Sequence, residues 1–69
     1  MTPYSIEVYR SDEDGAWIAV APDLLHCASH GATPHEAVAE VEDAIAAWLD
    51  AAQSTGRTIP RPSLRAARA

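Results

Sequence analysis

The first half of the chain alternates between apolar and polar positions, a pattern typical of strands that bury one face. Residues 3–10, PYSIEVYR, direct Tyr4, Ile6 and Val8 to one side and the residues between them to the other. Residues 11–15, SDEDG, end in Asp-Gly, a common pair in tight hairpin turns because both residues tolerate positive φ. The pattern predicts a strand over 3–10 followed by a hairpin turn.

A second strand is predicted for residues 16–21, AWIAVA, which place Ile18 and Val20 on one face and Trp17 on the other. A Pro-Asp pair then ends this strand. Residues 26–30, HCASH, are short and weakly apolar and precede a glycine, and we interpret them as a third, edge strand. Together the three segments predict an antiparallel sheet.

Both ends of a long helix are indicated in the second half of the chain. Thr33 is a favourable N-cap, Pro34 suits the first helical position, and Glu36 follows three residues after the cap. These residues form a capping box, in which side-chain oxygens accept hydrogen bonds from otherwise unpaired backbone N–H groups. The helix is predicted to end near Ser54, with Gly56 as its stop signal.

The predicted helix has two distinct faces. Its apolar residues recur every three or four positions: Val38, Val41, Ile45, Trp48, Leu49 and Ala52. Its acidic residues lie on the opposite side: Glu36, Glu40, Asp43 and Asp50. The helix contains neither Lys nor Arg, so this acidic stripe has no i,i+4 partner of its own.

The segment after the helix, RTIPRP, allows a short strand at most, because its two prolines cannot donate ladder hydrogen bonds. The predicted order is β-β-β-α-β. We therefore expect an α+β domain over residues 1–62, with a three-stranded antiparallel sheet and a short fourth strand packed on one long helix. Residues 63–69 are expected to form a short basic tail.

Composition limits the class of protein. Sixty-nine residues make one small domain, which buries only about 60% of the surface that its unfolded chain exposes. Phe is absent and 15 residues are Ala, so the core is small and we expect a homo-oligomer, a dimer or tetramer, that completes it. A single Cys excludes a disulfide-rich scaffold. The longest apolar run has six residues and no signal peptide is visible, which favours a cytoplasmic protein without a membrane span.

Charge is distributed unevenly along the chain. All ten acidic residues lie in residues 1–56, where Arg10 is the only base, giving a net charge of −9. The last 13 residues carry four Arg and no acid. An acidic body repels nucleic acid and favours a basic partner, whereas the simpler interpretation is that the charge only keeps a small protein in solution.

A Cys and three His within ten residues raise the question of a metal site. On a strand, His26 and His30 share a face but lie about 13 Å apart at ~3.3 Å per residue, and Cys27 points to the other face. Zinc requires ligands that converge at about 2.0–2.3 Å, and the spacing matches no standard zinc motif. We therefore expect no metal and no cofactor, with Cys27 packed in the core.

The sequence lacks the arrangements of residues that the two most plausible kinds of catalysis need. A two-metal nuclease needs several carboxylates around ions about 3.5–4 Å apart, but Glu7 is the only acid inside a predicted strand. Asp12, Glu13 and Asp14 crowd an exposed turn. A Cys27–His pair has no third group to orient it. We expect no catalytic residues and no enzymatic activity.

The ordered set of motifs resembles the HicB family of antitoxins from bacterial toxin–antitoxin pairs. The resemblance is carried by four pieces over residues 4–62: an N-terminal strand and acidic turn leading to DGAWIAVAPDL; Cys27 with the G-x-T-x-x-E-A pattern from Gly31 to Ala37; one long helix; and Gly56 with Ile59-Pro60-x-Pro62. The family recurrently carries the Cys without a metal. The resemblance implies a partial ribonuclease-H-like fold with the fourth strand beside the first.

The resemblance also implies a function. The chain would bind and neutralise a small basic ribonuclease toxin that cuts mRNA, by covering its active site. Candidate partner-binding residues are then the acids of the helix stripe and of the hairpin turn: Glu36, Glu40, Asp43, Asp12, Glu13 and Asp14. The alternative is an orphan oligomeric binding module of the same fold that has no toxin partner.

Two departures from the family pattern stand out. The family usually continues Pro-Asp-Leu with Pro-Gly-Cys, whereas this chain has Leu25-His26-Cys27, which puts a His at a position suited to Gly. Only seven residues, SLRAARA, follow Pro62. Because that is barely two helical turns, we expect no C-terminal DNA-binding module of the kind that relatives add.

Overall fold

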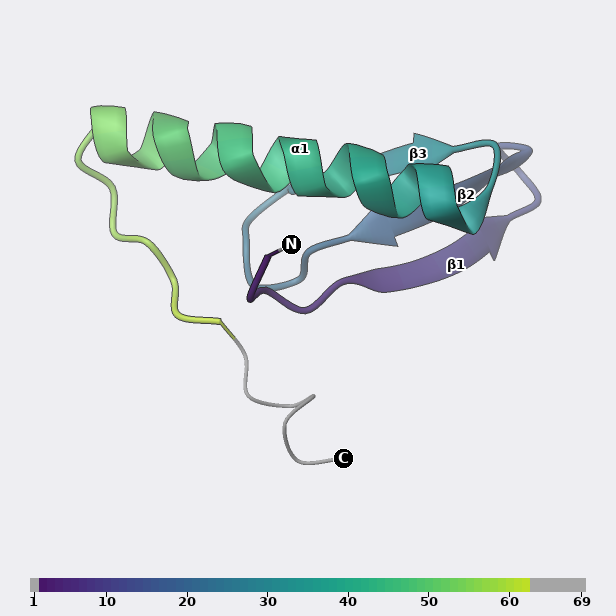
Figure 1. Cartoon of the computed structure of the whole chain (residues 1–69), viewed down its shortest axis with the longest axis horizontal. Coiled ribbons are helices and arrows are strands. Elements are labelled where there is room, and N and C mark those ends of the chain that lie inside the picture. The colour runs from purple at the N-terminus through teal and green to yellow at the C-terminus, as the bar shows by residue number, and fades with distance from the viewer. Residues whose placement is uncertain (1, 63–69) are drawn as a thin grey trace.

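One sheet and one helix make up the part of the protein that the structure describes. The computed structural model describes residues 2–62 (Figure 1). Its elements are, in order, β1 (Glu7–Ser11), β2 (Ala16–Val20), β3 (Ala28–Gly31) and α1 (Pro34–Ser54). The strands form an antiparallel sheet in the order β1-β2-β3. The α+β class, the three antiparallel strands and the single long helix predicted from the sequence are confirmed.

Strand register fixes which side chains share a face of the sheet. Tyr9 lies opposite Ile18, and Ile18 lies opposite His30. Trp17 and Ala19 belong to the other face, because successive side chains of a strand point to opposite sides. Ala19 is 0% exposed and Trp17 packs against the buried cluster, so their face is the one that α1 covers.

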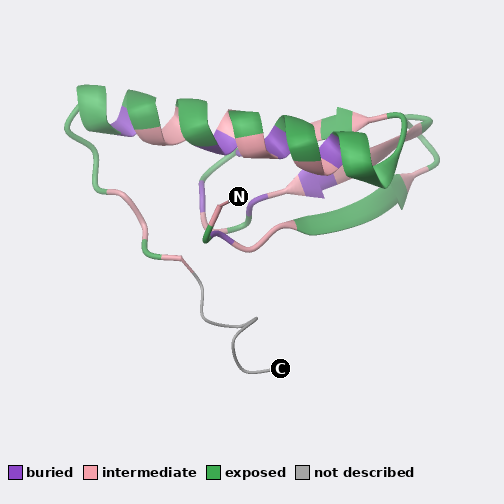
Figure 2. Cartoon of the chain, in the orientation of Figure 1, coloured by how far each residue is buried: buried purple, intermediate pink, exposed green. Residues whose placement is uncertain are grey.

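The helix covers the sheet unevenly. It lies over β3 and β2 and touches β1 only slightly (Figure 1). Val8 of β1 is on the helix side of the sheet, yet it remains 38% exposed. In Figure 2 the outer surfaces of α1 and of β1 are exposed, and burial is concentrated between α1 and the strands beside it.

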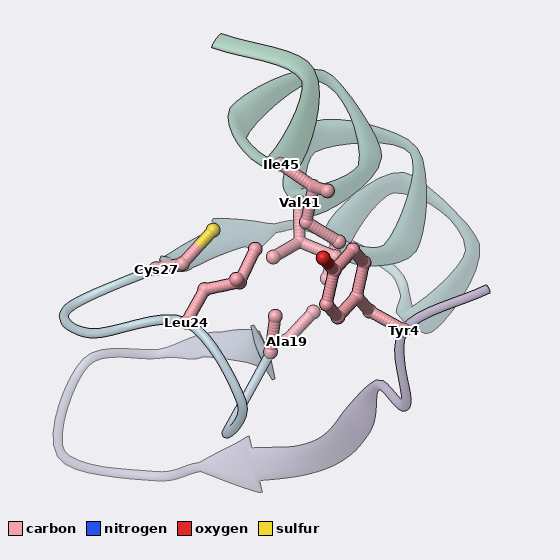
Figure 3. Close-up of a cluster of buried hydrophobic side chains, with 8 residues drawn as sticks. Tyr4, Ala19, Leu24, Cys27, Val41 and Ile45 are labelled. Atoms are coloured by element: carbon pink, nitrogen blue, oxygen red, sulfur yellow. The ribbon is translucent and has the colours of Figure 1, made fainter. Parts of the chain in front are cut away.

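The core is built largely from small residues. Its buried members are Tyr4, Ala19, Ala21, Leu24, Cys27, Ala37, Val41 and Ile45 (Figure 3). Alanines at the contact let the helix backbone approach the sheet closely. Gly31 belongs to the same contact, since a Cβ there would lie 2.6 Å from the backbone nitrogen of Ala37. The close approach therefore depends on the absence of a side chain at Gly31.

Side-chain and backbone caps define the helix as predicted. Thr33 Oγ1 accepts the N–H of Glu36 at 3.1 Å, and Glu36 Oε1 accepts the N–H of Ala32 at 3.2 Å. At the other end Gly56 adopts a φ of 72°, and the following N–H, that of Arg57, donates to a carbonyl of the last turn at 2.8 Å. Glu36 is thus part of the helix start as well as of the acidic stripe.

The hairpin turn differs from the two-residue turn that Asp-Gly favours. The connection is the four-residue loop 12–15, in which the N–H of Gly15 donates to the carbonyl of Asp12 at 3.3 Å. Gly15 has a φ of 63°, whereas Asp14 does not enter the positive region. A two-residue type I′ turn needs positive φ at both central residues, whereas this four-residue loop reverses the chain direction with positive φ at Gly15 alone.

The segment after the helix also differs from the expectation. Residues 57–62 form no strand, so the predicted short fourth strand is not seen in the described chain. The segment nevertheless returns to the start of the domain, where the Tyr4 hydroxyl donates to the Pro60 carbonyl at 2.6 Å. Tyr4 itself lies before β1, which begins at Glu7 rather than at residue 3.

The β2–β3 connection contains the only non-glycine residue with positive φ among residues 2–62. His26 has a φ of 60° and follows Leu25, and the N–H of Cys27 donates to the carbonyl of Leu24 at 3.2 Å to close the turn. The His therefore takes the conformation that suits the glycine of the family pattern. Trp48 Nε1 of α1 donates to the Leu25 carbonyl at 2.9 Å and anchors the loop.

Candidate functional site

Two acidic segments that are far apart in the sequence lie at the same end of the molecule. The β1–β2 hairpin turn and the start of α1 meet there, because β3 runs antiparallel to β2 and delivers the chain to α1 beside that turn (Figure 1). We define the acidic end by its five carboxylates: Asp12, Glu13, Asp14, Glu36 and Glu40.

A hollow of about 510 Å³ connects the two segments of the acidic end. It is lined by residues of the hairpin, of β3 and of α1: Gly15, Ala16, His30, Gly31, Glu36 and Glu40. The lining has no Lys or Arg. The hollow therefore presents carboxylates beside small residues, a surface that suits a cationic side chain better than an anion.

Hydrogen bonds hold the hairpin side of the acidic end. The Ser11 hydroxyl donates to Asp14 Oδ2 at 2.9 Å, and the Asp14 N–H donates to Ser11 Oγ at 3.3 Å. Arg10 Nε lies 3.6 Å from Asp12 Oδ1, but the Asp12 side chain is 98% exposed. An exposed pair of this kind contributes only about 0–1 kcal/mol, so it leaves the negative character of the turn largely intact.

On the helix side of the acidic end, fewer contacts within the chain offset the negative charge. Glu36 has a structural task at the N-cap, whereas Glu40 and Asp43 are exposed. Within residues 2–62, Glu13, Glu40 and Asp43 form no ion pair. Asp43 lies one helical turn beyond Glu40 and is outside the lining of the hollow. The structure thus brings five of the six predicted partner-binding residues to one end and leaves the sixth next to them.

His30 is a member of this surface that the sequence analysis did not assign to it. A second hollow of about 370 Å³ is lined by Asp14, Ala16, Ile18 and His30. It shares Ala16 and His30 with the hollow of the acidic end. His30 lies in the segment predicted as an edge strand, but the sequence does not show that it joins this surface, because that depends on the register that sets it opposite Ile18.

The Cys and His residues do not converge. Cys27 is 4% exposed in the core, and burial raises the pKa of its thiol, which keeps it neutral. His26 lies in the β2–β3 turn and His30 on the exposed part of β3. Over residues 2–62, no three His, Cys, Asp or Glu side chains are arranged to hold a metal ion. The packing predicted for Cys27 is confirmed.

The helix is not a membrane span. In the described part of the chain, no helix combines the length and the apolar character that crossing a bilayer requires.

Comparison with known proteins identifies the family. The sequence profile of the family described as "HicB_like antitoxin of bacterial toxin-antitoxin system" matches residues 4–68. The chain belongs to the HicB-like antitoxin family. The resemblance predicted from the strand, turn and helix motifs is confirmed, and HicB-like membership assigns the chain to toxin–antitoxin systems as an antitoxin, with a toxin as its partner.

A curated relative is similar to most of the chain, in keeping with the HicB-like assignment. The UPF0150 protein Ta0767 of Thermoplasma acidophilum is 32% identical over 54 residues, which is 78% of this chain and 78% of that protein. No solved structure matches the chain.

Proposed function

We propose that this HicB-like chain neutralises a small basic ribonuclease that cleaves mRNA, by binding over its active site. The observation that carries the proposal is the meeting of the two acidic segments at one end of the molecule, in a chain whose family consists of antitoxins. Neutralisation by occlusion requires binding alone, so the proposed role is not enzymatic and needs no cofactor or metal.

The proposed contact surface is the acidic end together with the adjoining helix acid. Its members are Asp12, Glu13, Asp14, Glu36, Glu40 and Asp43. Complementary charge steers a basic partner towards such a surface and raises the association rate. The mutual repulsion of carboxylates crowded at one end also falls when a basic partner binds.

We further propose that the protein acts in the cytoplasm, where mRNA is the target, and as a homo-oligomer. Support for self-association comes from the small core and from the outer edges of β1 and β3, which have no strand neighbour in the described sheet. A partial ribonuclease-H-like arrangement belongs to the same proposal. It is supported by the Tyr4–Pro60 hydrogen bond, which holds the segment after the helix near the start of the first strand.

The proposal expects a gene beside this one to encode a small basic protein, and the direct test uses that protein. Increasing amounts of the purified chain are mixed with that protein, and cleavage of an mRNA substrate is measured. The proposal predicts that cleavage stops at a fixed molar ratio. An equal amount of negative charge supplied as polyglutamate serves as the control, and it should inhibit without a stoichiometric end point.

Undiminished cleavage in the presence of excess chain contradicts the proposal and favours the orphan binding module. The absence of a gene for a basic protein beside this one would likewise favour the orphan binding module.

A further inference from the structure

The face of the sheet away from α1 is uncovered in residues 2–62. We define the open sheet face by five residues, Tyr9, Ile18, Val20, Ala28 and His30; the acid Glu7, which pairs with Val20, lies at its rim. The Tyr9 side chain, on the edge strand β1, is 52% exposed, and Ile18 and Val20 of the central strand β2 are only half-buried. Contiguous apolar surface with a polar rim is typical of interaction sites on soluble proteins.

The open sheet face continues into the acidic end. The hollow of about 370 Å³ lies across their junction and is lined by Ile18 of the open sheet face and by Asp14 of the acidic end. His30 belongs to this hollow and also to the hollow that contains Glu36 and Glu40. The apolar and acidic regions therefore form one uninterrupted surface around the hairpin.

We propose that the open sheet face and the acidic end are the two halves of one docking surface for a basic protein partner. The partner lays an apolar patch on Tyr9, Ile18 and Val20 and directs Lys or Arg side chains to the acidic end. This inference rests on the proposed function and extends it, because it adds an apolar half that charge alone does not identify. His30 lies at the junction and offers a hydrogen-bonding group there.

Area and charge decide against a second copy of the chain as the occupant. Three strands about 4.8 Å apart, two of five residues and one of four, cover at most roughly 14 by 17 Å, about 240 Å². Stable interfaces bury about 800 Å² on each partner, so any occupant must extend beyond the open sheet face. The surface it reaches next is the acidic end. A second copy would bring its own excess of acids there, whereas a basic partner brings opposite charge.

The test compares neighbouring residues of β1 that lie on opposite faces. Tyr9→Gln removes the aromatic ring from the open sheet face, and Val8→Gln is the control on the helix side, where the side chain is also partly exposed. Neither changes the net charge. Ile18→Thr is a second variant, which keeps a β-branched residue in the central strand. Circular dichroism and thermal unfolding verify that each variant folds.

Binding to the small basic protein encoded beside the gene is measured by surface plasmon resonance. We expect Tyr9→Gln and Ile18→Thr to weaken binding about tenfold or more, mainly through faster dissociation, and Val8→Gln to change it less than about twofold. Unchanged binding by the first two variants overturns the inference and leaves the proposed function standing. Failure of the native chain to bind the basic protein overturns both.

Sedimentation of the chain alone completes the test. The inference predicts that Tyr9→Gln leaves the oligomeric state of the free chain unchanged. A native dimer that becomes a monomer in Tyr9→Gln would assign the open sheet face to a second copy and overturn the inference.

Discussion

Replacing His26 with Gly should stabilise the protein, although it removes a whole side chain. His26 has a φ of 60°, where the Cβ of an L-residue approaches the following carbonyl oxygen, at a cost of about 1–2 kcal/mol. Gly has no Cβ and avoids that cost, but its unfolded chain is freer by about 0.5–1 kcal/mol. The side chain is exposed and makes no hydrogen bond within residues 2–62, so little else is lost.

The net gain expected for His26→Gly is about 0.5–1 kcal/mol. A domain of this size changes its melting temperature by about 4–8 °C per kcal/mol, which gives an increase of about 2–8 °C. Thermal unfolding followed by circular dichroism at one fixed protein concentration measures it, because self-association makes the midpoint depend on concentration.

Two further variants make the His26 test specific. His35→Gly makes the same chemical change in the first turn of α1, where backbone φ is ordinary, and should lower the midpoint slightly because Gly is the poorer helix former. His26→Ile places a β-branched residue at positive φ and should lower it clearly. A midpoint that stays the same or falls in His26→Gly, together with an unaffected His26→Ile, would refute the argument from backbone strain.

Three other substitutions test the packing of the core and the hydrogen bond that holds the segment after the helix. Gly31→Ala should cost about 1–3 kcal/mol in urea unfolding, because the new Cβ meets the backbone nitrogen of Ala37 at 2.6 Å. Burial raises the pKa of the Cys27 thiol in the folded protein. The stability that the neutral thiol contributes is therefore complete below the pKa of the unfolded thiol and is lost as the pH rises through the pKa of the folded thiol. The unfolding midpoint of the native chain should fall between about pH 7 and about pH 10 more than that of Cys27→Ala. Tyr4→Phe removes the 2.6 Å bond to the Pro60 carbonyl, should cost about 0.5–1.5 kcal/mol, and should speed tryptic cleavage of the segment after the helix; equal cleavage rates would contradict this.

Local signals in the sequence were sufficient for the elements of the fold. The capping box at Thr33 and Glu36 and the glycine at position 56 act within one turn of chain, so the helix bounds follow from neighbouring residues. The alternation of residues 16–21 likewise determines which side chains share a face. It does not determine which face is covered, because that depends on where α1 packs, and the helix covers the face of Trp17 and Ala19.

The parts that sequence patterns did not supply depend on contacts between distant segments. Asp14 and Glu40 lie 26 positions apart, and only the register of β2 with β3 sets their segments at the same end. His30 acquires its place between two hollows for the same reason. Residues 57–62 form no strand, in keeping with two prolines that cannot donate ladder hydrogen bonds, and their return to the start of the domain includes one long-range hydrogen bond, from the hydroxyl of Tyr4.

The central claim is that a basic partner contacts the acidic end, and a pair of matched charge reversals tests it most directly. Glu40→Lys and Asp50→Lys change the net charge equally, and both residues are exposed on α1. They lie about 15 Å apart along the helix axis, at 1.5 Å per residue. At an ionic strength of about 0.1 M the Debye length is about 10 Å, so a contact at one position is screened from the other.

The measurement is the association rate with the small basic protein encoded beside the gene, followed by stopped flow at several salt concentrations. The account predicts that Glu40→Lys slows association markedly more than Asp50→Lys at about 0.1 M salt, and that both effects shrink at higher salt. Equal slowing by the two variants at that salt, or no slowing by either, would contradict a contact at the acidic end.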